Sequence, residues 1–130
     1  MITVDKITPS AFDSIACVSS VSFAGEERAF VNHENGLYVA YWVDYSDVKS
    51  SGQIGIYFEL GDALAGATDH VKATCVALLA GLIGLRLSAD LRGDKTAAIG
   101  SGGRTVASDY DLEGLFDKLV KYASDNGIEI

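Results

Sequence analysis

Residues 69–91 form the most apolar stretch of the chain, and this run most constrains what the chain can fold into. Apolar residues recur at helical spacing from Val71 onward, and the opposite side of the same helix is also apolar. A helix that is apolar nearly all round must be buried on more than one side. The part without charged residues, between Lys72 and Arg86, is shorter than the ~20 residues that a membrane span needs.

The start of this helix is expected at Thr68, whose hydroxyl can accept a hydrogen bond from a first-turn amide. Its end allows two interpretations. Either Gly84 stops the helix and residues 85–91 then alternate as a strand, or the helix continues to Leu91 and is closed by Gly93. Because each glycine inside a helix costs roughly 1 kcal/mol, the shorter helix followed by a strand is favoured.

Upstream of this helix, aromatic and β-branched residues predict an antiparallel meander of about four strands. The clearest strand covers residues 37–45. The turn before it, Glu34-Asn35-Gly36, is predicted because Asn-Gly accepts positive φ at both central positions. The other strands are expected at residues 18–23, 28–32 and 53–60, with loops over residues 46–51 and 61–66.

Two shorter helices are expected near the chain ends. Pro9 suits the first turn of a short N-terminal helix over residues 10–17. Residues 112–124 carry an apolar stripe typical of an amphipathic helix, and Asn126-Gly127 should end it. Residues 128–130 are expected to add an edge strand.

The predicted fold class is α+β, with the β-meander packed on the central apolar helix. Residues 85–91 and 96–100 are expected to pair as a further hairpin. The chain has 130 residues, which suffices for a core that folds alone, so we predict a single domain over residues 1–130.

The formal net charge of −8 excludes nucleic acid as a partner, because a negative surface repels phosphates. The acidic residues are scattered rather than gathered in dense runs, which argues against mimicry of a nucleic acid. The charge instead predicts a protein partner with a basic surface.

Cys17 and Cys75 lie in apolar surroundings and indicate buried thiols rather than a disulfide framework. The start of the chain has neither the basic nor the apolar segment of a signal peptide. We therefore expect a cytoplasmic protein.

The first candidate site is a glycine-rich loop that follows an apolar strand. Glycines let backbone amides approach an anion, and nearby basic side chains add positive charge. The loop matches neither a dinucleotide-binding fingerprint nor a Walker motif, so a flexible surface turn is the alternative interpretation. The candidate ligand-binding residues are Lys95, Gly100, Ser101, Gly102, Gly103 and Arg104.

The second candidate site is one face of the aromatic strand. Alternation places Tyr38 and Trp42 on one face of that strand, and Tyr41 and Tyr45 on the other. If the helix covers the first face, the second points outward, where tyrosine often marks a protein interface. The alternative is a sheet packed on both faces. The candidate partner-binding residues are Tyr41, Asp44, Tyr45 and Asp47.

No catalytic or metal-binding motif is recognisable. The sequence has two histidines, His33 and His70, whereas a zinc site needs three or four ligands. The serines lack the framing motif of an activated nucleophile, and the acidic residues match no calcium-binding loop. We therefore expect no metal and no cofactor, and we favour a protein that is not an enzyme.

The predicted element order, size and charge resemble class I type III secretion chaperones. Those are small acidic cytoplasmic dimers built as helix, three strands, helix, two strands and helix, and this chain would have one extra strand. Small phage-encoded inhibitors of bacterial defence fit the same description.

We predict a non-enzymatic acidic binding protein that acts as an inhibitor, adaptor or chaperone. A homodimer or higher oligomer is expected, because the central helix has more apolar surface than one small sheet covers. The alternative is a small-molecule or anion-binding protein, or an enzyme, that uses residues 100–103.

Overall fold

The computed structural model describes residues 2–7, 15–44, 50–89, 97–101, 104–109 and 111–129. These residues form two helices, a five-stranded sheet and a three-stranded sheet, which confirms the α+β class. The chain divides into two compact units, Met1–Val71 and Lys72–Ile130, and each is described by itself. The boundary falls inside helix α1, Leu60–Leu82. The expectation of a single domain stays a prediction.

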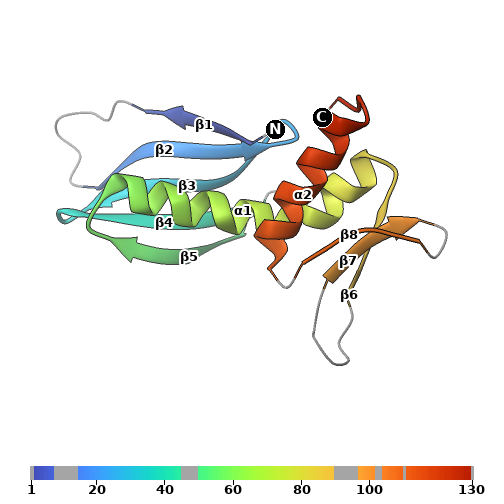
Figure 1. Cartoon of the computed structure of the whole chain (residues 1–130). Helices are drawn as coiled ribbons and strands as arrows, with labels where there is room; N and C mark the ends of the chain where they lie inside the picture. Colours follow the sequence, from blue (N-terminus) through green and yellow to red (C-terminus); the bar gives the residue numbers. More distant parts are fainter. Residues whose placement is uncertain are drawn as a thin grey trace. The chain divides into compact units, whose positions relative to one another are not determined.

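The first unit holds an antiparallel meander whose strands pair in chain order, β1-β2-β3-β4-β5 (Figure 1). Asn35 and Gly36 join β3 to β4, and both have positive φ, as the Asn-Gly turn predicts. The strands are β1 Thr3–Lys6, β2 Ile15–Phe23, β3 Glu26–Glu34, β4 Leu37–Asp44 and β5 Ser50–Tyr57.

One face of this sheet is buried and packs against α1. Cross-strand pairing places four fully buried residues of β2, β3 and β4 on that face: Val21, Ala29, Val31 and Ala40. The helix meets them with small residues one turn apart, and these are fully buried too: Ala63, Ala67 and Val71. Gly66 on the same part of the helix leaves room for the Tyr57 side chain of β5. A Cβ atom on Gly66 would overlap the Tyr57 hydroxyl.

The helix begins well before Thr68, so the expected start was wrong and residues 61–66 are helical rather than a loop. The Glu59 carbonyl accepts the Ala63 amide at 3.2 Å, which places the cap of the helix at Glu59. Glycine propensity indicated a loop here. Tertiary packing overrides it, because the Tyr57 side chain of β5 occupies the space that a side chain at position 66 would need.

The helix ends as the shorter interpretation predicted. Gly84 has φ of 80°. The Leu85 amide donates to the Ala80 carbonyl at 2.8 Å, and the Gly84 amide donates to the Gly81 carbonyl at 3.2 Å. This pair of bonds is the Schellman motif, which satisfies the last carbonyls of a helix. Strand β6, Arg86–Ala89, follows directly.

The second unit holds the three-stranded sheet β6-β7-β8 and helix α2, Leu112–Asp125. β7 spans Ala97–Ser101 and β8 spans Arg104–Asp109. Helix α2 contacts β7 and β8, and an ion pair of 2.9 Å joins Lys72 of α1 to Asp117 of α2. The buried stripe of α2 consists of Leu115, Phe116, Leu119 and Ala123.

Several other expectations were wrong. Residues 15–17 belong to β2 rather than to an N-terminal helix over residues 10–17, because Ile15 and Ala16 pair with β3. The rest of that predicted helix lies outside the described residues. Residues 50–51 open β5 instead of ending a loop, and residues 128–129 form no strand. Strand β8 was not anticipated. The secretion chaperones begin with a helix, whereas residues 15–17 of this chain belong to a strand.

Candidate functional site

The face of the five-stranded sheet opposite α1, here called the outer face, is built from one residue of each strand in a continuous row. Pairing aligns this row one position away from the buried residues, so its side chains point to the opposite side of the sheet. The row consists of Asp5, Ser20, Phe30, Tyr41 and Gln53.

Tyr41 is held at the centre of the outer face by two contacts. Its ring stacks on the Phe30 ring, with centroids 5.1 Å apart and planes 21° from parallel. Its hydroxyl donates a hydrogen bond of 2.5 Å to the Glu34 carboxylate. These contacts fix an aromatic ring and a carboxylate relative to each other, which reduces the entropy lost when a partner binds.

Apolar side chains extend this surface along β5. Ile56 pairs with Val39 of β4 in the next row of the outer face and is 56% exposed. Phe58 directly follows β5 and is 85% exposed. Exposed large apolar residues next to fixed aromatic rings are typical of protein interfaces.

The first unit also carries nearly all of the net negative charge. Residues 1–71 contain three basic and ten acidic residues, whereas residues 72–130 contain seven basic and eight acidic ones. Pairing places Asp5 opposite Ser20 and Glu27 opposite Ser22, so both lie on the outer face with Glu34. Lys6 pairs with Ser19 on the other face. The outer face therefore complements a basic surface.

The hydrogen bond to Glu34 raises the pKa of Tyr41, with burial and the Glu34 charge acting in the same direction. The raised pKa means that this pair stabilises the folded state. The stabilisation is fully present when the pH is below about 10, the pKa of tyrosine in the unfolded chain, and it is lost as the pH rises through the higher pKa of folded Tyr41.

We predict that Glu34→Gln lowers the pKa of Tyr41, because it removes the charge that opposes phenolate formation. The pKa is measured by NMR on protein with ¹³C-labelled tyrosine, with Tyr41→Phe used to assign the signal. Glu27→Gln, elsewhere on the outer face, should leave that pKa unchanged. An unchanged pKa in Glu34→Gln would contradict this role of the pair.

The structure places some of the predicted partner-binding residues and not others. Tyr41 lies on the outer face, whereas pairing with Ser50 places Asp44 on the opposite side at the end of β4. Tyr45 and Asp47 lie outside the described residues. Phe30, Ile56 and Phe58 were not predicted for this site.

Two of the predicted ligand-binding residues meet in the second unit. Ser101 ends β7 and pairs with Arg104, which begins β8. Both line a pocket of about 470 Å³ together with Leu85 and Tyr122. Gly100 has a structural reason to be glycine, since a Cβ atom there would overlap the Arg104 carbonyl oxygen. Lys95, Gly102 and Gly103 lie outside the described residues.

Within the part of the chain that the structure describes, no group of three or more His, Cys, Asp and Glu residues is placed to hold a metal ion. The His33 ring instead packs against the Tyr38 ring, and the two ring centroids are 4.9 Å apart. Burial lowers the pKa of His70, and it raises the pKa of the Cys17 thiol.

Comparison with protein-family models, with curated proteins and with solved structures found no match for this chain. Among the described residues, no helix is both long and apolar enough to cross a membrane.

Proposed function

We propose that this chain is a non-enzymatic acidic binding protein that holds a basic protein partner on its outer face. The observation that carries the proposal is the fixed pair of Tyr41 and Glu34, beside the exposed Ile56. An aromatic ring with a neighbouring carboxylate suits a lysine or arginine side chain, which packs its stem on the ring and pairs its charge.

Charge favours the same class of partner. With three basic residues against ten acidic ones, the first unit attracts a positively charged protein over distances of about a Debye length, ~8 Å at physiological salt. Such a partner would be recruited quickly and then held by the apolar side chains of the outer face. In this proposal the chain acts as an inhibitor, adaptor or chaperone in the cytoplasm.

A homodimer or higher oligomer remains part of the proposal. Leu78 and Leu82 of α1 are 38% and 54% exposed in the single chain, so they offer apolar surface for self-association. Analytical ultracentrifugation of the wild type and of Leu82→Ser measures this directly, and the variant should shift towards monomer. A monomeric wild type would remove self-association from the proposal.

Paired variants on the two faces of the same sheet test the proposal. The double variant with Tyr41→Ala and Ile56→Ser should bind the partner recovered from host lysate at least about tenfold more weakly, as expected for interface anchors. The control is Val4→Ser, which removes an apolar side chain that is 43% exposed and pairs with the buried Val21.

Binding is measured by biolayer interferometry at two salt concentrations. The association rate of the wild type should fall at high salt, because the partner is basic. Equal affinities for the double variant and Val4→Ser would exclude the outer face as the binding site.

A further inference from the structure

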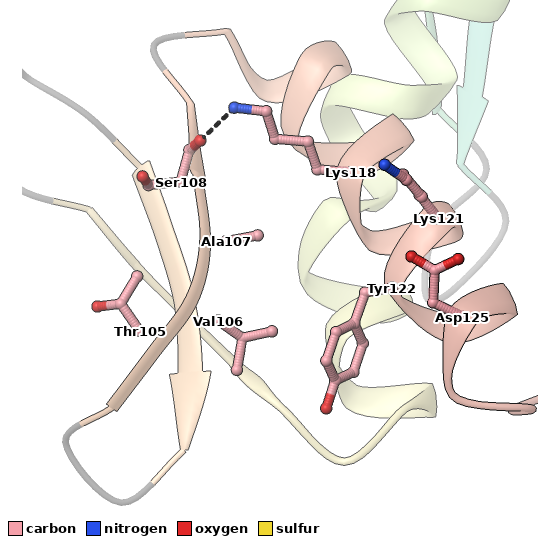
Figure 2. Close-up of a pocket in the computed structure, with 8 residues that line it drawn as sticks. All are labelled: Thr105, Val106, Ala107, Ser108, Lys118, Lys121, Tyr122 and Asp125. Carbon is pink, nitrogen blue, oxygen red and sulfur yellow. Dashed lines mark hydrogen bonds between the residues drawn. The ribbon is translucent and has the colours of Figure 1, made fainter.

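A groove runs between β8 and α2 in the second unit. Residues 105–108 of β8 line a pocket of about 420 Å³ together with Lys118, Lys121, Tyr122 and Asp125 of α2 (Figure 2). The pocket at Ser101 and Arg104 shares Thr105, Val106 and Tyr122 with it. The two pockets are therefore adjoining parts of one groove along β8, which we call the β8–α2 groove.

The wall formed by β8 is a strand edge. β8 is the last strand of the order β6-β7-β8, so in the described part of the chain only β7 pairs with it. Side chains of a strand alternate between faces, and a pocket lined by four consecutive residues is typical of a strand edge. Amides and carbonyls that point away from the neighbouring strand at such an edge can bond to another strand.

One hydrogen bond shows which way this edge points. The Lys118 ammonium group donates to the Ser108 carbonyl at 2.7 Å, as Figure 2 shows, so that carbonyl faces α2 and not β7. In an antiparallel strand the amide and carbonyl of one residue point to the same side. The Ser108 amide therefore also faces the groove.

The groove carries positive charge. Lys118 also pairs with Asp109 at 3.2 Å. No ion pair among the described residues involves Lys121 or Arg104, which lie on the α2 side and at the start of β8. Among the described residues, Asp125 is the one acidic residue that lines either pocket. A ligand with carboxylates complements this lining.

We propose that the β8–α2 groove binds an extended acidic segment of a partner protein, which adds to β8 as a further strand. Its backbone accepts a hydrogen bond from the Ser108 amide, because the Ser108 carbonyl is already bonded to Lys118. Its acidic side chains meet Lys121 and Arg104, and its apolar side chains pack on Tyr122. A groove between an edge strand and a helix suits this mode, in which main-chain bonds give affinity and side chains give specificity. The site goes beyond the proposed function, because it lies in the other unit and selects the opposite charge.

The test uses a displayed library of random seven-residue peptides, selected on the full-length protein after depletion on Ser108→Pro. Proline removes the amide that faces the groove and is tolerated at a strand edge. We expect the recovered peptides to contain Asp or Glu between apolar residues. Lys121→Glu does not alter the edge of β8, and it should weaken binding of these peptides at least about tenfold. The control Lys6→Glu on β1 should leave their binding unchanged.

Three results would overturn the proposal. The first is a selection that recovers no peptide or only basic peptides. The second is peptide binding to Lys121→Glu that equals binding to the wild type. The third is that methylation of the peptide backbone nitrogens leaves affinity unchanged while inorganic phosphate competes, which would indicate an anion site and not strand addition. Because Lys121→Glu changes an exposed side chain, its result stands even if Ser108→Pro does not fold.

Discussion

Replacing Leu79 by alanine should lower the free energy of unfolding by about 2–5 kcal/mol. Leu79 is fully buried and is one of the largest such side chains among the described residues. Its truncation removes buried apolar surface and leaves a cavity, because the surrounding side chains relax only partly. The neighbouring Leu78 provides a matched control, since it is 38% exposed on the same helix.

The measurement is urea unfolding of both variants, followed by circular dichroism. The protein concentration is one at which ultracentrifugation finds the monomer, because Leu78 also belongs to the surface proposed for self-association. Leu78→Ala should cost less than about 1 kcal/mol, as is usual for an exposed position. If the two substitutions lower the free energy of unfolding equally, the burial of Leu79 and the exposure of Leu78 on α1 are contradicted.

Replacing Gly100 by alanine should lower the free energy of unfolding by about 1–3 kcal/mol, as overpacking does in a tight site. The added Cβ atom would overlap the carbonyl oxygen of Arg104, where the β7–β8 register shifts by one residue. A backbone atom in a paired strand cannot move aside as a flexible side chain does. The hairpin must therefore distort.

Gly81→Ala is the control for this change. Gly81 lies in α1, and a Cβ atom there meets nothing within 4 Å. Because alanine is the better helix former, the free energy of unfolding of this variant should equal that of the wild type or exceed it by up to about 1 kcal/mol. A Gly100→Ala variant as stable as the wild type would contradict the described hairpin.

This result bears on how the glycine-rich loop is tested. A loss of ligand binding in Gly100→Ala would follow from the distorted hairpin alone. Arg104→Ala removes the charge from the groove and leaves the backbone intact, so it separates a binding role from a structural one.

Most elements upstream of α1 could be predicted from local patterns. Strand β4 and the Asn35-Gly36 turn follow from β-branched and aromatic residues and from the positive φ of Asn-Gly. The end of α1 at Gly84 also follows from local signals. The start of α1 does not, because its first turns are defined by how closely Gly66 packs against Tyr57.

The two sites differ in how far the sequence determines them. Alternation in β4 predicts that Tyr41 and Trp42 lie on opposite faces. The stacking of Tyr41 on Phe30 and its bond to Glu34 depend on the register of the hairpin. The β8–α2 groove was beyond sequence analysis, because β8 itself has only weak alternation and its edge is defined by pairing with β7.

Native mass spectrometry of the protein, purified gently from lysate of its own host, tests the central claim most directly. The wild type and Val4→Ser should each retain a basic protein, and the double variant with Tyr41→Ala and Ile56→Ser should lose it. A complex that survives in the double variant, or a bound small molecule in place of a protein, would contradict the proposal that the outer face binds a basic partner.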